Sequence, residues 1–95
     1  MDCSEIVFSG HAVQRMYERS LREADVVHVI RQGEVIEAYP HDTPYPSNLL
    51  LAFVRTIPIH AVVARVQTSD RCIVVTVYVP DPARWNSDFK TRRHP

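Results

Sequence analysis

The sequence predicts an α+β fold: two N-terminal helices packed on one face of a four-stranded antiparallel sheet, followed by a short C-terminal arm. Apolar residues recur with helical spacing between residues 10 and 32, whereas alternation and β-branched residues dominate after Gly33. Short turn signals separate the later segments, as in antiparallel hairpins. The chain has 95 residues, of which 45% are hydrophobic, so we expect one domain over residues 1–95.

The first helix follows Ser9, a suitable N-cap residue. The second helix is expected over about Leu21–Gln32, because Ser20–Glu23 has the S-x-x-E pattern of a capping box. Gly33 stands where a glycine in the left-handed conformation would end this helix. The apolar stripe of the first helix consists of Ala12, Val13, Met16 and Tyr17.

The four strands of the predicted sheet are Glu34–Tyr39, Leu49–Ile57, Ile59–Thr68 and Cys72–Val79. Pro58 and the turn Ser69–Arg71 are expected to separate the last three, and the last strand is apolar on both faces, which is typical of a central strand. The short apolar segment Glu5–Phe8 leaves a further strand open, and the proline-rich segment His41–Ser47 is expected to be a loop.

The C-terminal segment Ala83–His94 is expected to be a short helical turn or an arm. Trp85 and Phe89 are four residues apart, and we expect them to pin this segment to the sheet rather than to stack on nucleotides. A basic cluster that suits phosphates follows: Lys90, Arg92 and Arg93. The alternative for this cluster is a solvated, frayed terminus.

The charge is balanced overall but uneven along the chain. Eleven basic residues offset eleven acidic residues, and all but one of the basic residues are arginines. Residues 1–48 hold four arginines against eight acidic residues, whereas residues 49–95 hold seven basic residues against three acidic ones. A net charge of zero argues against a nucleic-acid-binding protein, but it can hide one basic face.

Cysteine usage and the termini predict a cytoplasmic protein without membrane contact. Cys3 and Cys72 are far apart and have no C-x-x-C partner, so we expect two free thiols in a reducing cytosol. The N-terminus lacks the basic and apolar regions of a signal peptide, and no apolar run is long enough for a membrane span. The five histidines are scattered without metal-ligand spacing, so we expect no metal and no cofactor.

One face of the first helix carries His11, Arg15 and Arg19 at steps of four residues. A histidine can transfer a proton near neutral pH, and arginine can stabilise a phosphate as its negative charge builds. Together they suit RNA cleavage without a metal. Spacing alone favours the alternative, a solvated face on which Arg15 and Arg19 pair with Glu18 or Glu23.

His60, Tyr78 and Tyr39 are further candidates in the predicted strands. His60 could act as a partner acid or base on the open face of the sheet, or it could be a structural residue at a strand end. Either tyrosine could stack on a base or donate a phenolic proton, although core packing with one satisfied hydroxyl is the commoner role.

The chain resembles the bacterial domain-of-unknown-function family 4258 over about residues 8–92. The elements H-A-x-x-R-M-x-E-R and T-V-Y-x-P-D are specific in combination. The resemblance is carried by Ser9–Arg19, Gly33–Pro40, Pro44–Pro46, Pro58–Val62, Thr76–Asp81, Trp85 and Phe89.

That family is similar to the RelE and BrnT toxins of bacteria. The similarity implies a single RelE-like, toxin-type domain and an mRNA endonuclease that acts freely or on the ribosome. It also implies a co-encoded antitoxin with a zinc finger or a helix-turn-helix. The residues of the family pattern are His11, Arg15, Arg19, Tyr39, His60 and Tyr78.

We therefore expect a metal-free endoribonuclease of a type II toxin–antitoxin pair. The expected catalytic residues are His11, Arg15, Arg19, His60 and Tyr78. The expected RNA-binding residues are Lys90, Arg92, Arg93 and Tyr39. The neutral charge departs from typical basic toxins and predicts weak RNA binding without the ribosome.

A non-catalytic interaction domain is the alternative function. The apolar segment Leu49–Val54 would pair readily with another chain if it formed an exposed edge strand. The protein would then be a homodimer or bind a protein partner through its sheet. A small-ligand binder is a third, weaker possibility because so short a chain leaves little room for a deep pocket.

Overall fold

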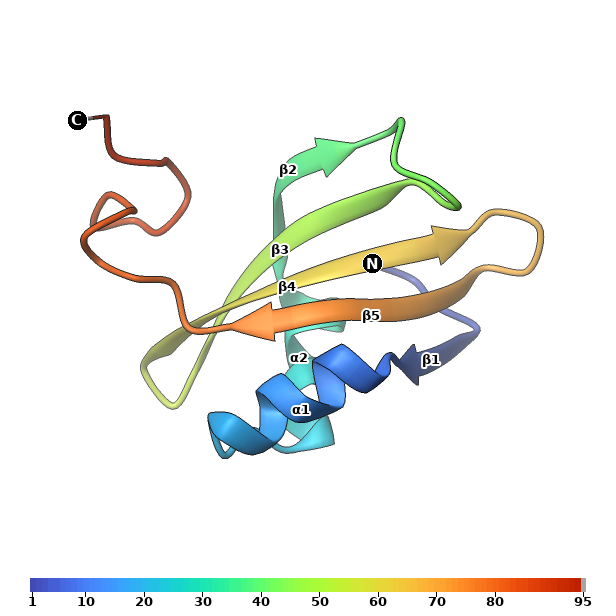
Figure 1. Cartoon of the computed structure of the whole chain (residues 1–95), viewed down its shortest axis with the longest axis horizontal. Coiled ribbons are helices and arrows are strands. Elements are labelled where there is room, and N and C mark those ends of the chain that lie inside the picture. Colours follow the sequence, from blue (N-terminus) through green and yellow to red (C-terminus); the bar gives the residue numbers. More distant parts are fainter. Residues whose placement is uncertain (95) are drawn as a thin grey trace.

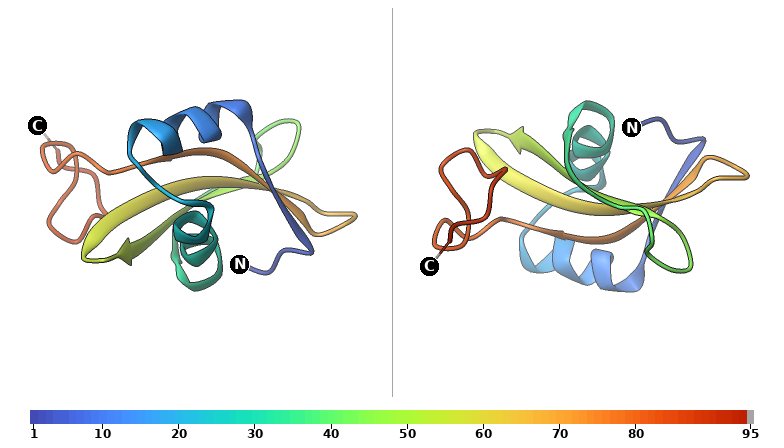
Figure 2. Two further views of the ribbon diagram at one scale, coloured as in Figure 1. Left: turned by 90° about the horizontal axis from the view of Figure 1, so that it is seen from below. Right: turned by 90° about the horizontal axis from the view of Figure 1, so that it is seen from above.

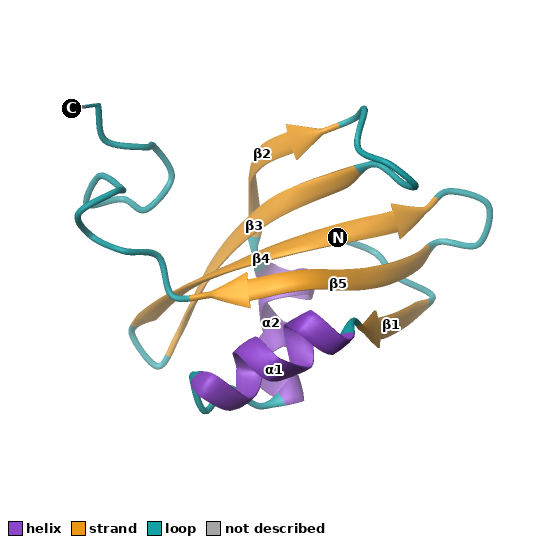
Figure 3. Cartoon of the chain, in the orientation of Figure 1, coloured by secondary structure: helices purple, strands orange, loops and turns teal. Residues whose placement is uncertain are grey.

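Residues 1–94, which the computed structural model describes, form a mixed sheet of five strands with two helices beside it (Figures 1 and 3). The helices are α1 (Gly10–Glu18) and α2 (Glu23–Gln32). The strands are β1 (Glu5–Phe8), β2 (Glu34–Tyr39), β3 (Ser47–Val54), β4 (Ile57–Val66) and β5 (Arg71–Tyr78).

The strand order is β1-β5-β4-β3-β2, and β1 is parallel to β5 whereas the other neighbours are antiparallel. The predicted four-stranded antiparallel sheet preceded only by helices is therefore wrong. The register pairs Glu5 with Arg71 and Phe8 with Val74. Hairpin signals report on neighbours in the sequence, whereas this pairing joins segments 66 residues apart. A parallel pair needs such a long connection, and no local pattern marks it.

The helix termini partly follow the predicted signals. Ser9 caps α1 as predicted, because its side chain accepts a hydrogen bond from the Ala12 N–H. The predicted box Ser20–Glu23 is wrong: Arg22 is the N-cap of α2, and the Asp25 carboxylate accepts from its N–H at 3.0 Å. Ser20 instead takes a left-handed φ of 54° in the connecting turn.

Gly33 ends α2 with a φ of −72°, so its predicted left-handed conformation is wrong. It is glycine for another reason: a Cβ atom there would collide with the carbonyl oxygen of Val29 and crowd that of Leu51. The prediction that Pro58 separates two strands is also wrong, because Pro58 lies within β4 opposite Phe53. The β3–β4 turn is made by residues 55 and 56 instead.

The hydrophobic core lies between the helices and one face of the sheet. α1 runs along β5, whereas α2 crosses β3 and β4 and is seen nearly end-on in Figure 2. Both helices contribute to one cluster of buried side chains with the strands. Its members are Ala12, Met16, Val26, Val29, Ile30, Leu50, Val54, Ile59, Ala61, Val63, Cys72, Val74 and Val77.

The C-terminal arm, residues 80–94, is a small hairpin rather than the predicted helical turn (Figure 3). The Arg93 N–H donates to the Arg84 carbonyl at 2.8 Å, and the Asn86 N–H donates to the Thr91 carbonyl at 2.8 Å. Trp85 is buried and forms a bridge with Arg92 between these two bonds. The arm leaves the end of β5 and covers His60, on the face of β4 opposite to the core residues Ile59 and Ala61.

Cys3 and Cys72 form a disulfide, so the prediction of two free thiols is wrong. The parallel pairing of β1 with β5 brings together two cysteines that are 69 residues apart, with Cα atoms 5.6 Å from each other. Sequence separation gave no indication of this contact. As to membranes, neither helix of residues 1–94 has the length and apolar character that a bilayer span requires.

Candidate functional site

His60 and Tyr78 lie opposite each other on β4 and β5, on the face of the sheet opposite to the core residues Ile59, Ala61 and Val77. The His60 side chain has no exposed surface. Its Nε2 is 2.8 Å from the Phe89 carbonyl oxygen, and its Nδ1 is 3.2 Å from the Tyr78 hydroxyl. The Trp85 ring packs edge-on against the imidazole, with ring centroids 4.5 Å apart. The arm thus closes over His60.

The hydrogen-bond partners of His60 define its protonation. A carbonyl oxygen can only accept, so Nε2 carries a proton and donates to Phe89. Burial lowers the pKa of His60, which favours the neutral ring at neutral pH. Nδ1 then has a free lone pair that accepts from Tyr78. Burial raises the pKa of Tyr78, so its phenol holds its proton and donates the hydrogen bond to His60.

Arg92 connects the arm with β2. Its guanidinium lies 4.8 Å from the centroid of the Trp85 ring and 3.9 Å from Oε2 of Glu37. The same carboxylate oxygen accepts from the Tyr39 hydroxyl at 3.0 Å. Burial raises the pKa of Tyr39, and the hydrogen bond to Glu37 adds to that effect. Tyr39, Glu37 and Arg92 therefore form one polar chain beside the His60 cluster.

Two hollows share both Trp85 and Arg92 in their lining. One has a volume of about 250 Å³ and brings together Tyr78, Arg84 and Arg92, with Trp85 and Asp81 on its walls. The second has a volume of about 320 Å³ and is lined by Ile36, Glu37, Trp85, Lys90, Thr91, Arg92 and His94. The first hollow offers a phenol and two guanidiniums to a ligand. Such a set of donors suits a phosphate oxyanion.

The predicted residues of α1 lie outside these hollows. His11 is exposed and its Nε2 is 3.0 Å from the Thr76 hydroxyl. Thr76 precedes Tyr78 by two residues on the same face of β5, so His11 reaches the rim of that face about 7 Å along the strand from Tyr78. Arg15 is exposed and pairs with Glu18 at 3.0 Å, as the solvated-face alternative expects.

Arg19 is the C-cap of α1 and is exposed. Figure 1 shows α1 and β5 running in the same direction. The C-terminal end of α1, which Arg19 caps, therefore lies toward the end of β5 where the arm begins. The structure thus gathers His60, Tyr78, Tyr39 and Arg92 in one place. It leaves the α1 residues along the edge.

The basic residues of the arm are engaged within the protein. Lys90 Nζ lies 3.0 Å from Oε1 of Glu34 on β2. The Arg93 Nε–H donates to the carbonyls of Pro82 and Trp85 at 2.9 and 2.8 Å, which holds the arm hairpin together. Ion pairs with β2 therefore reduce the positive potential that Lys90 and Arg92 would give the surface.

Glu37 and Arg84 were not singled out from the sequence, although both belong to the site. Glu37 belongs to an alternating strand, and Arg84 follows a proline-rich turn, so each looks like an ordinary surface residue. Only the packing of the arm against β2 gives them a role. Among residues 1–94, no group of three or more His, Cys, Asp or Glu side chains is arranged to hold a metal ion.

Comparison with known families gives one match. The family model described as "Domain of unknown function (DUF4258)" matches residues 8–79, which include both helices and β2–β5 but not the arm. The matched range is shorter than the predicted one, which extended to residue 92, since Trp85 and Phe89 lie beyond residue 79. Searches of curated proteins and of solved structures each gave no match. Because the match covers most of the sequence, the chain belongs to the family of the domain of unknown function DUF4258.

Proposed function

We propose that this protein is a toxin-like mRNA endonuclease, similar in kind to RelE and BrnT toxins, which cleaves RNA without a metal ion. One observation carries the proposal: Tyr78 lines a hollow with Arg84 and Arg92, and the buried His60 accepts the hydrogen bond of its hydroxyl. This arrangement suits cleavage of a phosphodiester, because His60 can act as the base, Tyr78 can carry the proton to it, and Arg84 and Arg92 can bind the phosphate.

In this reaction Arg84 and Arg92 hold the scissile phosphate. The ribose 2′-oxygen bonds to phosphorus while its proton passes to the Tyr78 oxygen, and the phenolic proton passes to Nδ1 of His60. The P–O5′ bond breaks, and His11 at the rim gives a proton to the leaving oxygen. The products are a 2′,3′-cyclic phosphate and a 5′-hydroxyl. Arg15 and Arg19 would contact phosphates further along the strand.

An RNA reporter with in vitro translation tests this proposal. The purified protein should cleave the reporter or slow translation, and Tyr78→Phe should reduce the rate by about 10²-fold, because removal of a proton-transfer group typically has that effect. Arg71→Gln serves as a control and should reduce it by less than about threefold, because this exposed arginine lies at the start of β5 and lines neither hollow. A protein that neither cleaves RNA nor slows translation, with His11→Ala indistinguishable from it in cells, would contradict the proposal.

The same proposal includes partners and a location. The substrate places the protein in the cytoplasm, with the ribosome supplying RNA contacts that a neutral chain makes poorly. An antitoxin of the zinc-finger or helix-turn-helix type would be encoded beside it. A neighbouring reading frame of that kind would support the proposal. In the cytoplasm the Cys3–Cys72 pair would be reduced under ordinary conditions.

A non-catalytic interaction domain is a second candidate, supported by α1. Tyr17 is 87% exposed and Val13 is 53% exposed, and the two lie one turn apart on the helix. The earlier reason for this function is wrong, because Leu49–Val54 belongs to β3, which is paired on both sides by β2 and β4. If this face binds a second copy, sedimentation should show a dimer for the unchanged protein and a monomer for Tyr17→Ser.

A further inference from the structure

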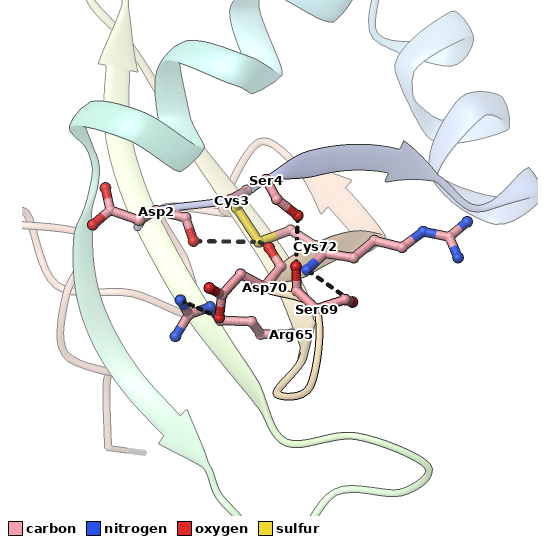
Figure 4. A network of polar contacts seen from close by, with 8 residues as sticks. Asp2, Cys3, Ser4, Arg65, Ser69, Asp70 and Cys72 are labelled. Atoms are coloured by element: carbon pink, nitrogen blue, oxygen red, sulfur yellow. Dashed lines mark hydrogen bonds and ion pairs between the residues drawn. A yellow bond between two sulfur atoms is a disulfide. The ribbon is translucent and has the colours of Figure 1, made fainter.

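The N-terminal segment is fastened to the start of β5 by a cluster of short contacts (Figure 4). The Ser4 N–H donates to the Asp70 carbonyl at 2.9 Å, and the Ser4 hydroxyl donates to the Ser69 carbonyl at 2.7 Å. The Cys3–Cys72 disulfide lies beside these bonds. Cys72 is fully buried in the core, whereas Cys3 is only half-buried, so the two residues of the disulfide differ in their access to solvent.

A hollow of about 520 Å³ opens next to the disulfide. Its lining consists of Met1, Asp2, Cys3, Ser4, Arg31, Gln32 and Asp70. The volume falls within the ~300–1,000 Å³ that small-molecule sites occupy. Arg31 brings a positive charge to the wall, whereas Asp2 and Asp70 bring carboxylates, and that of Asp70 is 2.9 Å from Arg65. The hollow is therefore suited to a small zwitterionic molecule, with carboxylates toward Arg31 and an ammonium group toward the acidic residues.

We propose that this hollow is a thiol–disulfide exchange site, in which a small anionic thiol of the glutathione class attacks Cys3. The site does not depend on the proposed endonuclease. A bound thiol would meet the Cys3 sulfur first, because Cys3 lines the hollow and Cys72 is buried. Arg31 would attract the carboxylates of the thiol and raise its local concentration.

The exchange is balanced over two steps. The glutathione thiolate bonds to Sγ of Cys3, the Cys3–Cys72 bond breaks, and Cys72 leaves as a thiolate that takes up a proton. A second glutathione thiolate attacks the glutathionyl sulfur, which releases Cys3 as a thiolate and forms glutathione disulfide. Two electrons thus pass from two glutathiones to the protein. Glutathione disulfide reverses both steps and restores the bond.

Reduction should free β1 without unfolding the core. β1 has four residues and pairs only with β5, while Ile6 and Phe8 pack on the core from outside and are only partly buried. The Glu5–Arg71 ion pair at 3.1 Å is exposed and contributes little. The disulfide is therefore a principal restraint on residues 1–8. The exchange site would control whether the sheet has five strands or four.

Intact-mass spectrometry of the folded protein in glutathione buffers tests the site. We expect Cys72→Ala to take up one glutathionyl group from glutathione disulfide, and Cys3→Ala to take up none while it stays folded by circular dichroism. Hydrogen exchange at residues 5–8 should rise at least tenfold on reduction, while the amides of β4 keep their protection. A disulfide that glutathione does not reduce in the folded protein would overturn the proposal, as would equal labelling of the two variants.

The role of Arg31 is tested by comparing the reduction of the disulfide by a charged and by an uncharged thiol. Arg31→Gln should slow reduction by glutathione by about threefold, because one attractive charge is lost near the wall. It should leave reduction by uncharged 2-mercaptoethanol unchanged. Arg19→Gln, a charge change on α1, is the matched control and should affect neither rate. Equal effects of Arg31→Gln on both thiols would show that the hollow does not recognise the carboxylates.

Discussion

At the scale of single residues, His60 shows how one side chain joins the fold to the chemistry. Its imidazole has no exposed surface, yet both nitrogens have hydrogen-bond partners. A buried polar group that is fully paired stabilises one arrangement of its neighbours. His60 therefore fixes both the Tyr78 hydroxyl and the Phe89 carbonyl, and with the latter the position of the arm.

The stability of the protein should depend on pH through His60. Burial lowers its pKa in the folded state below the unfolded value of about 6.5. The unfolded state then binds more protons in acid, so the stability that neutral His60 contributes is present above about pH 6.5 and is lost as the pH falls below it. Thermal unfolding between pH 5 and 8 should show this loss. His60→Gln should flatten the profile, and an unchanged slope would contradict the assignment.

Asp25 is a second residue that serves two parts of the chain. Its carboxylate caps α2 at the Arg22 N–H and receives both terminal nitrogens of Arg55 at 3.0 and 3.2 Å. The hydrogen bonds from Arg55 lower the pKa of Asp25, followed by that from the Arg22 backbone. The stability it contributes is therefore present above about pH 4 and is lost as the pH falls toward the folded pKa.

Asp25→Asn should destabilise the protein by about 1 kcal/mol, the typical cost of a lost helix cap. Urea unfolding at pH 7 would measure this loss. The difference between the two proteins should shrink below about pH 4, where the wild-type carboxylate becomes protonated. A difference that is constant from pH 7 to pH 3 would show that the charge of Asp25 is irrelevant.

At the scale of elements, the β3–β4 hairpin carries a strained turn. Arg55 and Thr56 have φ values of 49° and 70°, so both central residues of this two-residue turn are left-handed. Such turns favour Asn-Gly, and a β-branched residue at positive φ is uncommon. Arg55 has a structural role in this turn, since its guanidinium pairs with the Asp25 carboxylate. Thr56 has no such contact among the described hydrogen bonds.

Thr56→Gly should therefore stabilise the protein by about 0.5–1 kcal/mol, because the relief of left-handed strain exceeds the added entropy of the unfolded chain. Thermal unfolding should give a higher midpoint. Thr68→Gly is the comparison, since Thr68 lies in the β4–β5 turn and has no positive φ. That variant should gain nothing. A lower midpoint for Thr56→Gly would show that its side chain contributes contacts that outweigh the strain.

At the scale of the whole molecule, the opposite charges of the two halves of the chain meet in space. The basic arm docks on the acidic strand β2 through Lys90–Glu34 and Arg92–Glu37. Both pairs are exposed, so each adds little stability. Their larger effect is on the field outside the protein, because the acidic partners cancel cations that would otherwise attract RNA.

Replacement of these acids should reveal the basic face. The double variant Glu34→Gln/Glu37→Gln should bind a single-stranded RNA more tightly, by about three- to tenfold at low salt, and with a steeper dependence on salt. Fluorescence anisotropy at several salt concentrations would measure both. The variant Glu18→Gln/Glu23→Gln has the same net charge but changes α1 and α2, so it should bind less tightly than the first. Equal affinities would mean that net charge alone decides binding.

The sequence by itself determined the local structure. Helical spacing located both helices, the Ser9 cap was read correctly, and Glu34–Tyr39 is a strand with the expected bounds. These features depend on contacts within a few residues, which composition and spacing record. The family of the chain was likewise identified from its motifs, and the match over residues 8–79 confirms it.

Only the tertiary structure decided the parallel β1–β5 pair, the disulfide and the site at the arm. Each joins residues far apart in the chain: Cys3 with Cys72, His60 with Phe89, and Glu37 with Arg92. Side chains that meet only after folding obey no spacing rule, because the distance between them is set by the packing of other elements. That is why Tyr78 and Arg92 could be named from the sequence, while the roles of Glu37 and Arg84 and the hollow that Tyr78 shares with Arg92 could not.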